Sequence, residues 1–426
     1  MTAFVLFTGL LVFLLLGVPV AMALGLSSAI VMIFMTDQTM MSLALKFAHT
    51  MKVYPLLAIP FFILAGTLMS TGGVAKRMID FAMASLGHFK GGLAMAAVLA
   101  CALFAAVSGS SPATVLAIGP IVIAAMIKSG YSKEFAAGVI CNAGTLGILI
   151  PPSIVMVVYA SVTQTSVGKL FMAGIVPGIL LTLMMMMAIY IVTRNKDIQC
   201  APKASFQEVL RSGREALWGL MLIIIIMGGI YAGVFTPTEA AAVSAVYALV
   251  VVVFVYKDLK LTEIPKVLTE SAKLTVTLMF IIANAYVFAF VLTTEQIPQS
   301  AAEAILNSGL SPWMFLLIVN LILLIAGNFI DPTSVILIVV PIIFPIAMGL
   351  GIDPVHLGIM MVINMEIGLV SPPVGLNLFV TSGVTGMPLV DMIRAALPWL
   401  LLLLAALVLI TYVPAISTFL PNMMFD

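Results

Sequence analysis

Stretches of about 20 apolar residues recur along this chain, and each is long enough to cross a lipid bilayer as a helix. Only 8% of the 426 residues are charged. Soluble proteins have about 25%, so lipid rather than water must surround most of the surface. The sequence therefore predicts an all-α polytopic membrane protein with about ten transmembrane helices. The spans are expected near 3–18, 19–35, 54–72, 135–160, 170–192, 217–235, 238–256, 274–292, 355–380 and 396–420.

The first two expected spans form one apolar stretch that is interrupted at Gly17, Val18 and Pro19. As a single helix this stretch would be about 50 Å long, which exceeds the ~30 Å hydrocarbon core of a bilayer. We therefore expect a break at Pro19, and one strongly tilted helix is the alternative.

The charge balance and the cysteines exclude several classes of protein. Lys and Arg number 18 against 17 Asp and Glu, with no long basic tract, so we expect no nucleic-acid partner. The three cysteines form no Cys-x-x-Cys pair and no disulfide framework. No His-Glu-x-x-His sequence is present, and we expect neither an enzyme nor a cofactor.

Two apolar regions, 91–128 and 311–351, carry small, polar, proline-containing centres. These centres are Ser108–Thr114 and Gly327–Ser334. Irregular backbone at membrane depth must be buried in protein or line an aqueous cavity. A re-entrant helical hairpin with its polar tip inside the membrane meets that requirement, so we expect one hairpin in each region. Two full spans joined by a surface turn are the alternative.

These regions belong to an internal repeat. Pro112 corresponds to Pro332, which lies 220 residues later. At an offset of 221, six prolines and glycines recur: Pro120, Gly130, Gly147, Pro151, Pro152 and Pro177 correspond to Pro341, Gly351, Gly368, Pro372, Pro373 and Pro398. The chain therefore divides into halves at 1–200 and 210–426. Each half has about five spans and one hairpin.

Basic residues mark one side of the predicted membrane protein. Lys and Arg concentrate in four expected loops, at 76–90, 128–133, 194–214 and 257–273. We place these loops in the cytoplasm. The segments 293–312 and 349–354 contain acidic residues but no Lys or Arg, and we place them outside. The hairpins then enter from opposite sides, which makes the halves inverted-topology repeats. Lys46 and Lys52 fall on the predicted outside, where we expect a short interfacial helix.

Inverted repeats with helices broken at mid-membrane are typical of secondary transporters. Each hairpin is followed by a span with tandem prolines, in Asn142–Ser153 and Asn364–Pro373. Tandem prolines prevent a continuous helix. The freed carbonyl oxygens suit an alkali cation, whereas half-helix N-termini favour an anion. One such motif alone more often serves helix packing, and the paired, symmetric placement is what predicts a binding site.

Asp331 and Glu366 are the only carboxylates expected at membrane depth, where an ionisable side chain marks a functional site by default. Asp331 is a candidate cation ligand, and Glu366 has either a functional or a structural role. No Lys or Arg is expected at mid-membrane. An anionic substrate would therefore depend on helix N-termini, hydroxyl groups and co-bound cations, and we expect its uptake to be coupled to a cation.

Six segments are distinctive in combination: Leu57–Phe62, Gly72–Arg77, Ser108–Thr114, Leu146–Ser153, Phe235–Ala242 and Ser371–Asn377. Together they resemble the large membrane subunit, of the DctM type, of tripartite ATP-independent periplasmic (TRAP) transporters. The resemblance extends over essentially the whole chain. It implies a multi-pass protein of the bacterial inner membrane that works with a small four-helix membrane subunit and a periplasmic substrate-binding protein.

The resemblance also implies an activity. A TRAP transporter takes up an organic acid with Na⁺ by an elevator motion, and the expected substrate is a C4-dicarboxylate such as succinate, malate or fumarate. The alternatives are a TRAP permease for sialic acid or another carboxylate, and a divalent-anion symporter that needs no binding protein. A channel is a more distant alternative.

Individual residues follow from the same resemblance. A first Na⁺ site would contain Ser108, Ser110, Gly147, Ile150 and Pro152, and a second Na⁺ site would contain Gly327, Asn328, Asp331, Gly368, Ser371 and Pro373. The substrate would lie beside Ser111, Thr114, Thr333 and Ser334. The moving transport domain would comprise about 91–192 and 311–420, and the fixed scaffold about 1–75 and 215–292. The second tip is acidic where the first has serine, so we expect the cation sites to differ.

Overall fold

The computed structural model describes residues 2–36, 39–196, 198, 200–307 and 309–425, and every regular element in these ranges is a helix. Within these ranges, nine helices are long and apolar enough to cross a membrane. Two of the nine are the second arms of the hairpins described below. The predicted all-α polytopic membrane protein is thereby confirmed.

The N-terminal apolar stretch is broken where the sequence predicts it. Helix α1 (Thr2–Leu15) ends before Gly17, and α2 (Val20–Met35) begins after Pro19. The next helix, α3 (Met40–Thr50), contains Lys46 and lies where a short interfacial helix was expected. One tilted helix across the whole stretch is therefore wrong.

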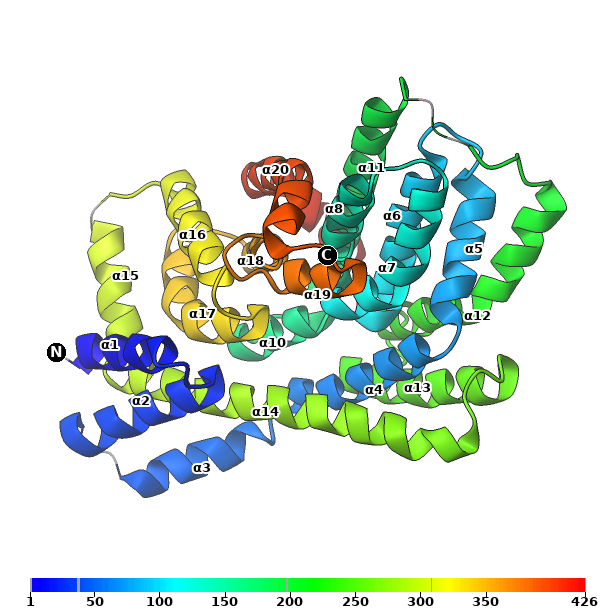
Figure 1. Cartoon of the computed structure of the whole chain (residues 1–426). Helices are drawn as coiled ribbons and strands as arrows, with labels where there is room; N and C mark the ends of the chain where they lie inside the picture. Colours follow the sequence, from blue (N-terminus) through cyan, green and yellow to red (C-terminus); the bar gives the residue numbers. More distant parts are fainter. Residues whose placement is uncertain (1, 37–38, 197, 199, 308, 426) are drawn as a thin grey trace.

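Helices α4 (Ala58–Thr71), α13 (Pro237–Val250) with its π-helical continuation (Val251–Val255), and α14 (Ile264–Thr294) lie along the lower edge of the molecule in Figure 1. Helix α12 (Phe206–Tyr231) rises at its right edge. Helix α14 packs against α2, α3 and α4, and α4 also packs against α13. Thr236 and Glu239 form a capping box at the start of α13, because the Thr236 N–H donates to Glu239 Oε2 at 2.8 Å.

The two predicted hairpins are present. The first consists of α6 (Gly92–Ser108) and α7 (Ser111–Lys128), and the second of α16 (Pro312–Gly327) and α17 (Pro332–Gly349). Gly109 makes the first turn with a φ of 59°, a left-handed conformation that glycine adopts without a steric penalty. Each turn is followed by a proline in the first turn of the next helix, where the missing N–H costs nothing.

Two helices were not expected from the sequence. Helices α5 (Val74–Leu86) and α15 (Ile297–Asn307) occupy segments that we expected to be loops, and each directly precedes a hairpin. Each helix has a buried apolar face, to which Met78 and Ala302 belong. Charged residues made the α5 segment look like a loop, and the α15 segment, whose only charge is Glu303, is too short to cross a membrane. One buried face is nevertheless sufficient to stabilise a short helix.

The span after each hairpin is broken as predicted. In the first half it comprises α8 (Lys133–Ala143), α9 (Leu146–Leu149) and α10 (Ile154–Thr163), and in the second half α18 (Pro354–Gly368) and α19 (Leu376–Thr385). Each half then continues with a long helix, α11 (Val167–Thr193) or α20 (Leu389–Tyr412). The expected last span at 396–420 starts earlier, and a separate helix, α21 (Ala415–Phe425), follows Pro414.

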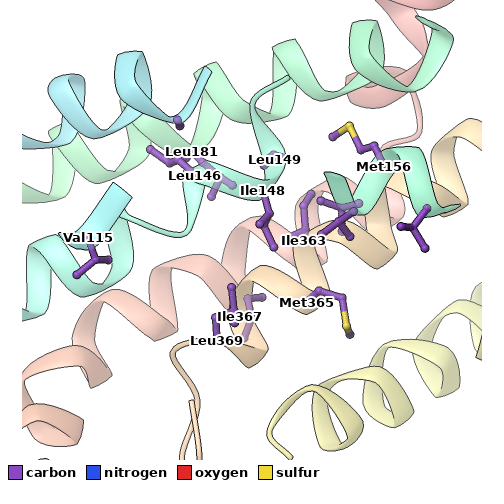
Figure 2. Packing of buried hydrophobic residues seen from close by; sticks show 14 of the residues in the cluster. Val115, Leu146, Ile148, Leu149, Met156, Leu181, Ile363, Met365, Ile367 and Leu369 are labelled. Carbon is purple, nitrogen blue, oxygen red and sulfur yellow. The ribbon is translucent and has the colours of Figure 1, made fainter. Parts of the chain in front are cut away.

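Helices of the two halves interleave around these broken spans. Helix α8 packs against α20, α7 against α19, α10 against α17, and α11 against α18 and α21. Figure 2 shows side chains from Leu146–Leu149 and from Ile363–Leu369 within one buried apolar cluster. The two halves therefore share a single core around the hairpin tips and do not form separate domains.

Candidate functional site

The first hairpin tip is held together by its own hydroxyl groups. Thr114 Oγ1 donates to the Ser110 carbonyl at 2.9 Å and lies 3.0 Å from the Ser108 hydroxyl. Ser108 and Thr114 are buried. Ser110 occupies the N-cap position of α7, yet its hydroxyl makes no capping hydrogen bond. That hydroxyl is therefore free of the role that an N-cap serine usually has, and it can serve as a ligand.

The first tip packs directly on the broken span that follows it. A Cβ atom added at Gly147 would lie 2.6 Å from the Ser110 carbonyl oxygen, and one at Gly109 would lie 2.8 Å from the Pro152 carbonyl oxygen. The carbonyl oxygens of Ile150 and Pro152 receive no hydrogen bond from any described residue. The structure thus brings together four of the five residues of the first predicted Na⁺ site, Ser108, Ser110, Gly147 and Pro152. Carbonyl oxygens that accept no hydrogen bond are of the kind that coordinate Na⁺ in broken helices.

The second tip repeats this arrangement with a carboxylate. Asp331 caps α17: it accepts hydrogen bonds from the Ser334 N–H at 3.0 Å and from Ser334 Oγ at 2.6 Å. A Cβ atom added at Gly368 would lie 2.8 Å from the Gly327 carbonyl oxygen, so this tip also packs closely on its broken span. The two tips differ in their capping, because Asp331 caps its helix and Ser110 does not.

Two further features of the second tip suit a cation. The side-chain Oδ1 atom of Asn328 is buried and has no hydrogen-bond partner among the described residues. The carbonyl oxygens of Ser371 and Pro373 likewise receive no hydrogen bond from the part of the chain that the structure describes. The buried Asn328 Oδ1 atom is costly without a donor unless a ligand satisfies it, and a hard cation such as Na⁺ would do so.

A cavity of about 330 Å³ lies between the two tips. Ser110, Ser111, Asp331 and Thr333 contribute its polar lining. The opposite wall is apolar and includes Leu278 and Ile281 of α14. The N-termini of α7 and α17 both lie at this cavity, and they carry the partial positive charge of their helix dipoles. The cavity therefore combines one acidic side chain, several hydroxyls and two helix N-termini, and its described lining contains no Lys, Arg or His.

The four predicted substrate residues separate into two pairs. Ser111 and Thr333 line the cavity, whereas Thr114 and Ser334 do not. The hydroxyls of the second pair are engaged inside the tips, Thr114 with Ser110 and Ser334 with Asp331. In each half, one predicted substrate residue therefore lines the cavity, and the second forms a hydrogen bond within its own hairpin tip.

Sequence reasoning missed a contact between Asn377 of the second half and the first tip. Asn377 of α19 is fully buried, and its Nδ2 atom donates to Ser111 Oγ of the first tip at 2.7 Å and to the Cys141 carbonyl at 3.2 Å. Asn377 thereby orients a predicted substrate residue of the other half. A polar side chain shortly after the tandem prolines was the available signal, because a buried amide in an apolar helix requires partners.

Two repeats, each with a hairpin tip packed on a broken span among membrane-length helices, are typical of multi-pass membrane transporters. The family model described as "Tripartite ATP-independent periplasmic transporter, DctM component" matches residues 7–416. The chain belongs to this family of TRAP transporter subunits. It is therefore a multi-pass inner-membrane transport protein and not an enzyme, as the sequence predicts.

Individual relatives agree with this assignment. The chain is 65% identical over 400 residues to the C4-dicarboxylate TRAP transporter large permease protein DctM of Pseudomonas aeruginosa, a match that covers 94% of each chain. It is 54% identical over 442 residues to the protein of the same name in Vibrio cholerae, which covers 99% of this chain and 97% of that one. The crystal structure of the YdaH transporter from Alcanivorax borkumensis matches with a TM-score of 0.68 at 15% identity, over 96% of this chain and 98% of that chain, and thus shares the fold.

Proposed function

We propose that this chain is the large permease subunit of a Na⁺-coupled TRAP transporter for a C4-dicarboxylate such as succinate, malate or fumarate. The observation that carries the proposal is the cavity between the two tips, which Asp331 lines. The buried Oδ1 atom of Asn328 in the second tip accepts no hydrogen bond from the described residues. The names of the relatives from Pseudomonas aeruginosa and Vibrio cholerae support the choice of substrate.

The electrostatics of the cavity support Na⁺ coupling. A dicarboxylate brings two negative charges to a cavity that already holds the Asp331 carboxylate and whose described lining contains no basic side chain. Negative charges that share one small cavity repel each other strongly in a medium of low dielectric constant. Na⁺ bound at the two tips would cancel this repulsion, so that the anion binds well only after the cations.

The packing supports an elevator motion. The cavity is enclosed on one side by the hairpins and broken spans, which form one interleaved core, and on the other side by α14. Movement of the core past α14 would carry the bound anion and cations together. On this proposal residues 91–192 and 311–420 move, and residues 1–75 and 215–292 stay fixed.

The proposal includes two partners, a small four-helix membrane subunit and a periplasmic binding protein that delivers the substrate. The word "tripartite" in the family description supports both. The test is uptake of radiolabelled succinate by proteoliposomes that contain the large and small subunits, with and without added binding protein. We expect saturable uptake that requires an inward Na⁺ gradient and the binding protein.

The same assay separates the alternatives. Uptake that persists without Na⁺ would overturn the coupling. Uptake that needs no binding protein would favour a divalent-anion symporter, and flux without saturation would favour a channel. If sialic acid competes with succinate, and malate and fumarate do not, the proposed substrate is wrong, whereas the proposed mechanism stands.

A further inference from the structure

A second polar cavity, of about 480 Å³, lies away from the hairpin tips, where α5, α12 and the π-helical segment 251–255 meet. Three arginines line it: Arg77, Arg211 and Arg214. These residues come from segments whose Lys and Arg content predicts that they lie on the cytoplasmic side. The cavity therefore sits at the predicted cytoplasmic end of α12.

Arg77 is held in place by neighbours that neutralise it. Its Nη1 atom lies 2.6 Å from Asp258 Oδ2, and its guanidinium group lies 3.8 Å from the centre of the Tyr256 ring. Asp258 Oδ2 also accepts a hydrogen bond from the Gly73 N–H at 3.0 Å. The Asp258 carboxylate neutralises Arg77, and together with the Tyr256 ring it holds the guanidinium group in one position at the wall of the cavity.

The remaining charges at the cavity do not balance. Arg211 Nε donates to Glu215 Oε1 at 3.2 Å, which pairs those two side chains one helical turn apart. Arg214 also lines the cavity, but it takes part in none of the ion pairs between described residues. With two neutral pairs and one additional guanidinium group, the lining residues and their ion-pair partners have a net charge of one positive unit, which suits a singly charged anion.

The rest of the lining is suited to a membrane surface. Trp218 is 46% exposed and Val255 is 39% exposed, and both line the cavity beside the arginines. Trp218 lies at the point where α12 changes from charged residues to a continuous apolar run. Tryptophan at such a boundary is typical of the region of lipid headgroups. One ligand would therefore meet arginine on one side and apolar surface on the other.

We infer that this cavity binds the headgroup phosphate of an anionic phospholipid of the cytoplasmic leaflet, with Arg214 and Arg211 on the phosphate and with Trp218 and Val255 against the upper acyl chains. Basic pockets between transmembrane helices on this side are suited to lipid headgroups, and guanidinium groups match phosphate oxygens in geometry. A phosphodiester headgroup with one negative charge, such as that of phosphatidylglycerol, complements the net charge. A lipid at this position would stabilise the fixed helices against which the core moves.

The exposed apolar lining favours a lipid over free phosphate, because inorganic phosphate would leave Trp218 and Val255 without a partner. The test measures binding of dioleoyl phosphatidylglycerol to the purified full-length protein by native mass spectrometry and by its melting temperature in detergent. Phosphatidylcholine and inorganic phosphate are tested in parallel. Arg214→Gln is compared with Arg194→Gln, which removes one exposed arginine from the same predicted side outside the cavity.

We expect phosphatidylglycerol to raise the melting temperature of the wild type more than phosphatidylcholine does, and inorganic phosphate to have no effect. Arg214→Gln should raise the half-saturating phosphatidylglycerol concentration about fivefold, whereas Arg194→Gln should change it little. Arg214→Lys keeps the charge but loses the planar guanidinium group, so it should raise this concentration by less than Arg214→Gln does. Equal stabilisation by inorganic phosphate, or equal losses in the two glutamine variants, would overturn the inference. Loss of phosphatidylglycerol binding when the small membrane subunit is added would also overturn it, because the surface would then belong to that subunit.

Discussion

Thr145 and Glu366 occupy equivalent positions in the two halves of the chain, 221 residues apart, and they are joined by a hydrogen bond of 2.6 Å between Thr145 Oγ1 and Glu366 Oε1. Both side chains are fully buried. Two equivalent residues of an inverted repeat can touch only close to the axis that relates the halves. Gly147 and Gly368, which pack on the two hairpin tips, lie two residues further along each chain segment. This hydrogen bond therefore connects the two broken spans directly beside the tips.

Replacing Glu366 with Ala should destabilise the protein. The substitution removes a buried hydrogen bond, at a cost of about 1–3 kcal/mol, and leaves a cavity between the broken spans. Glu366→Gln keeps the side-chain volume and retains a side-chain oxygen that can accept from the Thr145 hydroxyl, so it should stay close to the wild type. The measurement is the melting temperature of the purified variants in one detergent. An unchanged melting temperature in Glu366→Ala would show that the contact contributes nothing.

Gly147→Ala and Gly368→Ala should each impair uptake, because the new Cβ atoms would lie 2.6 Å and 2.8 Å from backbone oxygens of the tips. Relief of such overlap requires the tip to move away from its broken span, which costs about 1–3 kcal/mol and should lower uptake by about tenfold. Gly228→Ala is the matched control, since a Cβ atom added at Gly228 would meet no atom within 4 Å. Succinate uptake is compared at equal amounts of protein in the membrane, and similar activity of all three variants would contradict this account of the tips.

Asp331→Asn separates the charge of this residue from its capping role. Asparagine is as good an N-cap as aspartate, so α17 should remain intact while the negative charge is lost. Hydrogen bonds and ligand contacts to charged groups contribute about 1.5–3 kcal/mol, so the Na⁺ concentration for half-maximal uptake should rise by about tenfold or more. Ser110→Ala should raise it as well, through loss of a hydroxyl ligand at the first tip.

The control for this measurement is Asp353→Asn. Asp353 caps α18 in the same way, with its Oδ1 atom accepting from the Val355 and His356 N–H groups at 2.8 Å, but it does not line the cavity between the tips. We expect its Na⁺ dependence to match the wild type. An unchanged Na⁺ dependence in both Asp331→Asn and Ser110→Ala would refute the assignment of the cation sites.

The sequence predicts the parts of this fold that proline and glycine determine. The hairpin boundaries, the break at Pro19 and the interruptions at Pro151 and Pro372 follow from local backbone chemistry, which needs no knowledge of distant contacts. Helices α5 and α15 were missed because both are too short to cross a membrane, and only their burial against other helices reveals the apolar face.

The candidate site shows the same division. Symmetry in the sequence identifies both tips, but it does not reveal that Asn377 reaches Ser111 or that Thr145 reaches Glu366. Those contacts depend on how the two halves of the chain interleave. The position of α14 at the cavity likewise depends on tertiary packing, because Leu278 and Ile281 belong to an ordinary apolar helix.

The neighbours Thr333 and Ser334 allow substrate binding to be separated from cation binding. Thr333 lines the cavity, whereas Ser334 Oγ donates to Asp331 Oδ1 behind it. Thr333→Val keeps the shape of the side chain and removes the hydroxyl, so the succinate concentration for half-maximal uptake should rise by about tenfold with little change in Na⁺ dependence. Ser334→Ala should do the reverse, because it alters the hydrogen bonding of the Asp331 carboxylate. Both constants are measured for each variant in proteoliposomes, and a pair of variants that change the same constant would contradict the placement of these two hydroxyls.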